Sequence, residues 1–191
     1  MRARPFVAIV AARLYAELGT IEFTLLAALL VGMLAPQGLA GPIAFCCLAG
    51  IAVALAASPG RRPHLDHCEQ SAPLFGRELA RAKASAPCIA AVLTATAYLG
   101  AAQTRGGSGT PFAAPVVLSA VVACTLVALC AAIRRGLPRA LYLGVAVAAG
   151  AAAYSIAAVA GCVWGELLFC AVAAFFAVRQ YGEALARYDP M

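Results

Sequence analysis

Long apolar segments alternate with short polar segments along most of the chain. A membrane-spanning helix needs about 20 mainly apolar residues to cross a hydrocarbon core of roughly 30 Å. On that scale, candidate spans occupy residues 21–35, 42–57, 87–102, 112–133, 140–159 and 162–178. The pairs within 21–57 and 140–178 leave room for very short turns only, and re-entrant half-helices are the alternative there. The pattern predicts an all-α, polytopic membrane protein with six transmembrane helices.

Residues 1–19 are expected to form a helix that lies along the membrane interface. Its apolar positions recur at steps of three and four residues and share one face, while two charged residues share another face. The apolar set is Val7, Val10, Leu14 and Leu18, and the charged set is Arg13 and Glu17. Glu22 then enters the first span at its cytosolic end.

The longest hydrophilic segment, residues 58–85, opens with several turn-forming residues and continues into a predicted short helix over residues 74–84. At helical spacing, Phe75, Leu79 and Ala82 lie on one face of this helix, and Arg77 and Arg81 lie on another. Ser85 is expected to cap the third span.

The whole chain is therefore predicted to be a single transmembrane domain. Its parts are the interfacial helix (1–19), spans one and two (21–57), a cytosolic loop with a short helix (58–85), spans three and four (86–133), spans five and six (140–178) and a tail (179–191).

Composition and charge support this assignment and give it an orientation. Apolar residues make up 64% of the chain and charged residues only 12%, whereas about 25% of a soluble domain is charged. Of the 14 cationic residues, all but Arg105 fall in segments on one side of the predicted spans. The positive-inside rule then places both termini in the cytosol. We expect a multi-pass protein of the inner (plasma) membrane. Because these cations flank spans, no nucleic-acid partner is expected.

The chain lacks the motifs of common enzyme classes. It has no phosphate-binding Gly-x-x-x-x-Gly-Lys-Ser/Thr sequence around its only lysine, Lys83, and no Gly-x-Ser-x-Gly or His-Glu-x-x-His. Only two aspartates are present, Asp66 and Asp189. We therefore expect no catalytic residues and no cofactor, and any ATP hydrolysis must come from a partner.

The densest polar cluster covers residues 64–69 and contains both histidines of the protein. His64, His67 and Cys68 are suitable ligands for zinc or copper. The alternative, favoured by a spacing that matches no established site, is that they are ordinary surface residues of a solvated loop.

Two acidic residues lie at or near membrane depth, where an ionisable group is a functional candidate by default. Glu22 could line a gate or pair with a neighbouring arginine at the cytosolic interface. Glu166 could line an outer gate or simply reach water at the headgroups.

The layout resembles the permease subunits of type 2 ABC exporters. The residues that carry the likeness run from Cys68 to Lys83, CEQSAPLFGRELARAK. They are similar to the acidic, then proline, then basic run that often precedes the third span of these permeases. The chain departs from the family in being short and in lacking large extracellular regions.

The resemblance implies a bacterial permease that is energised by a separate ABC ATPase subunit. The partners that it implies are that ATPase, a second copy or sister permease, and membrane lipid. It implies that the cytosolic segment docks on the ATPase through Leu74, Phe75, Arg77, Glu78, Leu79 and Arg81. The alternatives are a non-catalytic accessory or assembly subunit of a larger membrane complex, and a small membrane enzyme or metal-handling protein.

Overall fold

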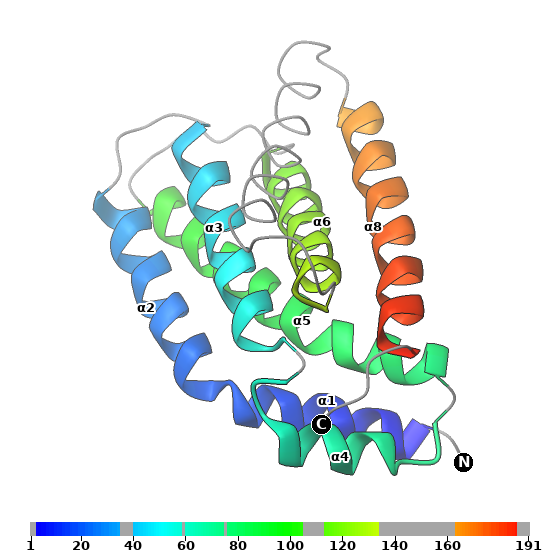
Figure 1. Ribbon diagram of the computed structural model, residues 1–191. Helices are drawn as coiled ribbons and strands as arrows, with labels where there is room; N and C mark the ends of the chain where they lie inside the picture. The colour runs from blue at the N-terminus through cyan, green and yellow to red at the C-terminus, as the bar shows by residue number, and fades with distance from the viewer. Residues whose placement is uncertain are drawn as a thin grey trace.

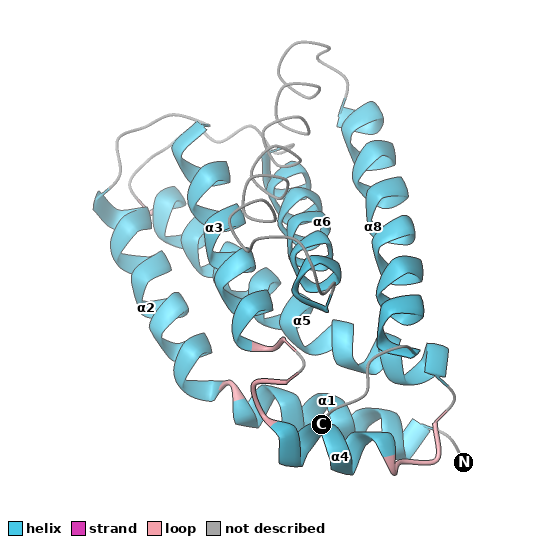
Figure 2. Ribbon diagram, viewed as in Figure 1, coloured by secondary structure: helices cyan, strands magenta, loops and turns pink. Residues whose placement is uncertain are grey.

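The structure is a computed structural model that describes residues 3–34, 40–58, 60–74, 76–104, 113–133 and 163–186. All regular secondary structure in these ranges is helical, which confirms the all-α prediction there (Figure 2). The helices are α1 (Ala3–Ala16), α2 (Leu18–Leu34), α3 (Ala40–Ala56), α4 (Pro63–Gln70), α5 (Gly76–Gln103), α6 (Ala113–Ile133) and α8 (Val163–Ala186).

Five of these helices lie side by side as a bundle, and α1 and α4 lie across one end of it (Figure 1). The closest pairings within the bundle are α6 with α8, α2 with α5, and α3 with α6. Helices α2 and α5 run away from the end that α1 and α4 cover, whereas α3, α6 and α8 run toward it. We call the covered end the α1/α4 end.

Among the described residues, two helices are long and apolar enough to cross a membrane, α5 and the segment Trp164–Ala186 of α8. A third is reached only if α1 and α2 count together as one span, and these two helices are bent by 65° at their junction. The apolar segments Phe45–Ala56 and Val117–Ile133 are shorter. Six spans are therefore not supported by the described ranges, and the predicted span 140–159 lies outside them.

Helix α5 corrects the prediction for the end of the hydrophilic loop. The predicted short helix over residues 74–84 is not separate, because α5 begins at Gly76 and continues to Gln103. Ser85 does not cap a helix either. Its hydroxyl donates within α5 to the carbonyl of Arg81 at 2.6 Å. Pro87, two residues after Ser85, also lies inside the helix, although it lacks the N–H that an interior helical residue normally donates.

Helix α1 turns its charged face into the structure, and its predicted apolar stripe is divided: Val10 and Leu14 are half-buried against the core, and the other two members are exposed. Ile9, Arg13 and Glu17 are buried, while Val7 is 62% exposed and Leu18 is also exposed. The charged face turns inward because Arg13 finds carboxylate partners inside the structure. An outward apolar face carries no penalty where lipid is the neighbouring medium.

Helix α2 packs closely against α5. A Cβ added at Gly32 of α2 would lie 2.8 Å from both the Cβ of Ala101 and the carbonyl oxygen of Tyr98, so only glycine fits there. Lower in the same interface, the hydroxyls of Thr24 and Thr94 lie 3.3 Å apart. Small residues and paired hydroxyls are the features that hold helices together when both are surrounded by lipid.

Candidate functional site

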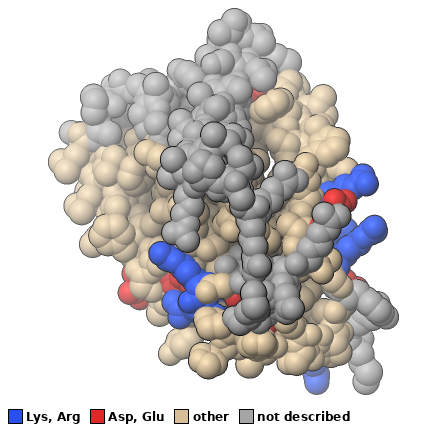
Figure 3. All heavy atoms as spheres, viewed as in Figure 1, with Lys and Arg blue, Asp and Glu red and all other residues tan. Residues whose placement is uncertain are grey.

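Charged side chains gather at the α1/α4 end of the molecule. Figure 3 shows the Lys and Arg atoms in the middle and lower parts of the view, close to most of the Asp and Glu atoms. The cations come from α1, the α3–α4 loop, the first turns of α5 and the end of α8, and they are Arg4, Arg13, Arg61, Arg62, Arg77, Arg81, Lys83 and Arg179. The upper part of the bundle contributes none among the described residues.

Helix α4 divides its polar residues between an inner and an outer face. It begins with Pro63 at its first position, where the missing N–H costs no hydrogen bond. Asp66 and Glu69, three residues apart on one face, are buried. His64, His67 and Cys68 lie on the exposed side. In the part of the chain that the structure describes, no group of three or more His, Cys, Asp or Glu side chains is arranged to hold a metal ion.

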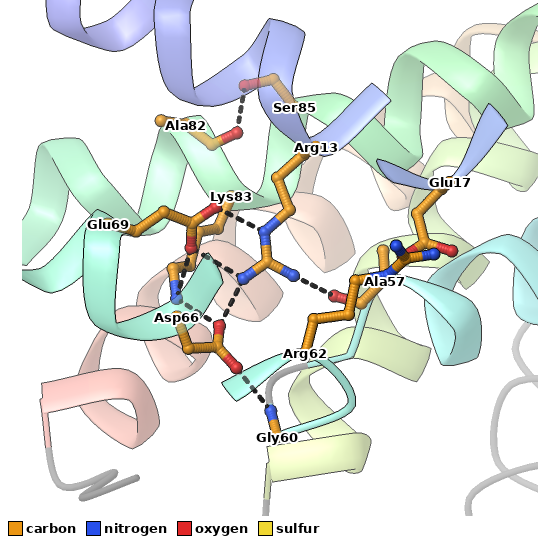
Figure 4. Close-up of polar contacts among 10 residues, drawn as sticks. All are labelled: Arg13, Glu17, Ala57, Gly60, Arg62, Asp66, Glu69, Ala82, Lys83 and Ser85. Carbon is orange, nitrogen blue, oxygen red and sulfur yellow. Dashed lines mark hydrogen bonds and ion pairs between the residues drawn. The ribbon is translucent and has the colours of Figure 1, made fainter. Parts of the chain in front are cut away.

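Arg13 of α1 and Lys83 of α5 meet the two inward carboxylates of α4 (Figure 4). The guanidinium of Arg13 donates to both oxygens of Glu69, from Nε to Oε1 at 2.5 Å and from Nη2 to Oε2 at 2.7 Å. Its Nη2 also donates to Oδ1 of Asp66. The ammonium of Lys83 lies 2.9 Å from Oδ1 of Asp66 and 2.8 Å from Oε2 of Glu69. We call these four residues the charge cluster.

Two backbone groups from the end of α3 and the following loop complete the cluster. Nη1 of Arg13 donates to the carbonyl of Ala57 at 3.3 Å, and the N–H of Gly60 donates to Oδ2 of Asp66 at 2.7 Å. Gly60 has a φ of 86°, a conformation that glycine adopts without strain. The cluster thus connects α1, α4 and α5 with the end of α3.

The charge cluster is buried and electrically balanced. Its four side chains are at most 3% exposed, and two positive charges face two negative ones. Burial alone would raise the pKa of Asp66, but the hydrogen bond from Gly60 and the positive charges of Lys83 and Arg13 hold its pKa below the usual value. Removing charges from water is costly, and balance together with complete hydrogen bonding is what makes it tolerable.

A second ion pair lies beside the cluster. Glu17, at the bend between α1 and α2, is buried, and its Oε1 lies 2.9 Å from Nε of Arg62. Arg62 is about half exposed. This pair fixes the bend against the loop that leads into α4.

The predicted docking residues do not all lie on the surface. Arg77 and Arg81 are exposed, and Leu74 and Glu78 are half-buried. Leu79 lies in the protein's own core with Ile9, Leu129 and Tyr181, so it is not available to a partner. Phe75 lies outside the described residues.

The two acidic gate candidates lie at opposite ends of the bundle. Glu22 is exposed near the start of α2, close to α1, whereas Glu166 is fully buried near the start of α8. This separation agrees with the predicted positions at the cytosolic and outer ends, and a gate at either residue stays a prediction. Glu166 contacts Ser119 of α6 and Cys170 of its own helix.

Sequence reasoning missed the charge cluster, although each member carried a signal. The sequence pattern favours a solvated loop for residues 64–69, and it identifies Arg13 and Lys83 only as indicators of topology. Asp66 and Glu69 are three residues apart on the same helix. Lys83 lies four residues after the buried Leu79, and Arg13 lies four residues after the buried Ile9. These spacings place all four on inward faces once the core positions are known.

Comparisons of the chain with protein-family models, with curated proteins and with solved structures found no match.

Proposed function

We propose that this chain is the membrane-spanning permease subunit of an ATP-driven ABC-type transporter, an exporter that is energised by a separate ATPase subunit. The proposal keeps the six-span layout with both termini in the cytosol of a bacterial cell. Its supports are the apolar helices at five of the six predicted positions, the cations gathered at one end, and the charge cluster.

The charge cluster is the observation that carries the proposal. A helix that receives a push from a motor must pass it to the spans, and a loop helix attached by apolar contacts alone could slide. Helix α4 is instead attached by directional, charge-assisted hydrogen bonds to Arg13 of α1 and by ion pairs to Lys83 of α5. Displacing α4 would therefore move both partners with it.

Helix α5 is long enough to carry the displacement into the membrane. Its 28 residues extend about 42 Å at 1.5 Å per residue, against a hydrocarbon core of roughly 30 Å. Its charged residues, Arg77, Glu78, Arg81 and Lys83, all lie before Ala84. The charged turns would protrude at the cytosolic surface while the remainder crosses the bilayer as one continuous rod.

The surface offered to the ATPase consists of the outer face of α4 and the exposed first turns of α5. Arg61 and Arg62 precede α4, and Arg77 and Arg81 lie on α5. All four are exposed cations, so the complementary surface would be acidic. Closure of two ATPases on two such permeases would tilt the spans against one another and open a path between them.

The test is to purify the tagged chain from its native membranes and identify the ATPase that accompanies it. We expect Arg77→Glu combined with Arg81→Glu to remove that ATPase or to abolish its transport-coupled activity. Arg179→Glu is the matched control, because Arg179 is an exposed cation near the same end on α8 and lies outside the proposed surface.

The proposal fails if the wild-type chain brings down no ATPase, or if the double variant retains the complex and transports normally. A complex that contains only other membrane proteins would favour the accessory-subunit alternative. The number of copies of this chain in the complex distinguishes a homodimer from a pair with a sister permease.

A further inference from the structure

The opposite end of the bundle holds one acidic side chain, Glu166, that the charge cluster does not involve. It lies in the first turn of α8, within the candidate span Trp164–Ala186, and it is 0% exposed. An ionisable side chain in a membrane span is costly to keep there and is by default a mark of function.

The hydrogen bonds of Glu166 are unequal between its two oxygens. Oε1 accepts from the hydroxyl of Ser119 at 3.1 Å and from the thiol of Cys170 at 3.3 Å. Oε2 is buried and has no hydrogen-bond partner among the described residues. A carboxylate shares its charge over two acceptor oxygens, whereas a carboxylic acid has one carbonyl acceptor and one hydroxyl. Two donors on Oε1 are compatible with the acid, in which Oε1 is the carbonyl oxygen and Oε2 carries the proton.

Among the described residues, no positive charge lies near Glu166 to balance an ionised carboxylate. Helices α3 and α6 contain no charged residue, and the charged residues of α5 lie in its first turns, at the other end. The titratable groups of the adjoining core are all weak acids. They are Cys46 and Cys47 of α3, Tyr98 of α5, Cys124 of α6 and Cys170 of α8. No ion pair within the described ranges includes Glu166, and without a counter-ion its charge would be removed by protonation.

A structural role as a helix cap does not explain the placement of this side chain. A carboxylate near a helix N-terminus is favoured by the helix dipole, and it caps by turning back toward the free N–H groups. Glu166 instead contacts Cys170, one turn further into α8, and Ser119 on the neighbouring helix. Its carboxyl group therefore points into the packed interface of α6 and α8.

We propose that Glu166 is a proton-binding site inside the membrane, which exchanges its proton with water at the surface opposite to the charge cluster. The O–H bond of the acid breaks on release, and the proton passes to that water. Trp164, two residues earlier, is 80% exposed and marks the interfacial level at which exchange would occur. This site is independent of the proposed ATPase partner.

A proton fits this site better than a metal cation does. Hard cations such as Mg²⁺ and Ca²⁺ take six or more oxygen ligands. Beside Glu166, the hydrogen-bonding neighbours in the described ranges provide one hydroxyl and one thiol. A proton needs only the carboxyl group itself.

The test uses dicyclohexylcarbodiimide, which modifies protonated carboxyl groups in apolar surroundings, on the purified full chain in detergent. Peptide mass spectrometry should find the label on Glu166, with labelling that increases as the pH is lowered. Glu183 is the internal control, because it lies exposed on the same helix and pairs with Arg179 at 3.4 Å. It should stay unlabelled.

Three outcomes would overturn the proposal. They are no label on Glu166 at any pH, equal labelling of Glu166 and Glu183, and suppression of the label by sodium or potassium ions at constant pH, which would identify a cation site instead. Because this experiment labels the wild-type chain, its result does not depend on whether a variant folds.

A variant gives a second, independent measurement. Glu166→Gln keeps the size and the acceptor oxygen of the acid but has no proton to release. We expect it to match the wild type in thermal stability at low pH. We expect the wild type, but not the variant, to lose stability when alkaline conditions remove the proton. An identical pH profile for both proteins would contradict the proposal.

Discussion

At the scale of single residues, the charge cluster is a closed set in which every member faces two partners of opposite charge. Arg13 contacts Asp66 and Glu69, and Lys83 contacts the same two carboxylates. Because all four side chains are buried, no water is at hand to replace a missing partner. The loss of one charge therefore leaves its opposite exposed to a medium of low polarity.

Lys83→Met should destabilise the protein strongly. Methionine fits the volume of the lysine stem but leaves two buried carboxylates against the single guanidinium of Arg13. Breaking a buried ion pair on one side typically costs about 3–5 kcal/mol. The measurement is the free energy of unfolding of the purified chain in detergent, with unfolding monitored as the loss of helical circular dichroism.

Two further variants separate charge balance from a general effect of mutating α5. Arg81→Met removes an exposed cation two residues earlier and should change stability by no more than about 0.5 kcal/mol. Lys83→Met combined with Asp66→Asn restores a neutral set and should be more stable than Lys83→Met alone. If the double variant is the less stable of the two, the charge-balance argument is wrong.

At the scale of elements, apolar periodicity predicted which segments are helical but not how the polar helices are turned. The ranges expected for spans one to four coincide with α2, α3, the later part of α5 and α6. The face of α1 could not be predicted, because a lipid-exposed apolar face and a core-facing one have the same sequence pattern. Only the partners of Arg13 on α4, more than fifty residues away, decide the orientation.

The start of α5 was also misplaced, for a local reason. Proline at position 87 and Ser85 before it are typical of a helix start, so the charged turns from Gly76 were assigned to a separate helix. In the structure Ser85 bonds back to Arg81 and the helix continues through Pro87. The continuity matters, since it connects the charge cluster directly to a candidate membrane span.

Close packing between α2 and α5 gives a test of the bundle at this scale. Gly32→Ala would place a Cβ 2.8 Å from the backbone oxygen of Tyr98, which cannot rotate away, and equally close to Ala101. We expect the two helices to separate locally, at a cost of about 1–3 kcal/mol, measured as a lower unfolding midpoint in detergent.

Gly19→Ala is the matched control on the same helix, because an added Cβ there meets nothing within 4 Å. It should leave stability unchanged or raise it slightly, since alanine is the better helix former. Equal effects of the two substitutions would mean that α2 and α5 do not pack as described.

At the scale of the whole molecule, polarity is divided between the two ends of the bundle. Among the described residues, the α1/α4 end carries the exposed cations and the charge cluster (Figures 1 and 3), and the other end carries the buried Glu166. Between them, helices such as α8 expose large apolar side chains, including Leu168, Phe175 and Phe176. This division could be predicted in outline from the distribution of arginine along the chain. The pairing of the buried charges could not, since it depends on contacts between distant segments.

The same division predicts the sidedness of the protein, and its own cysteines can report it. Cys68 is exposed on α4, while Cys46, Cys47, Cys124, Cys130 and Cys170 are buried in the bundle. In a Cys162→Ser background, which removes a thiol outside the described residues, a membrane-impermeant maleimide should label Cys68 in inside-out vesicles and not in intact cells. Adding Trp164→Cys places a second thiol at the exposed start of α8, and this one should react from the opposite side. If both positions are labelled from the same side, the bundle does not cross the membrane between them. If Cys68 is labelled from outside the cell, the orientation is the reverse of the one that the proposed docking of an ATPase requires.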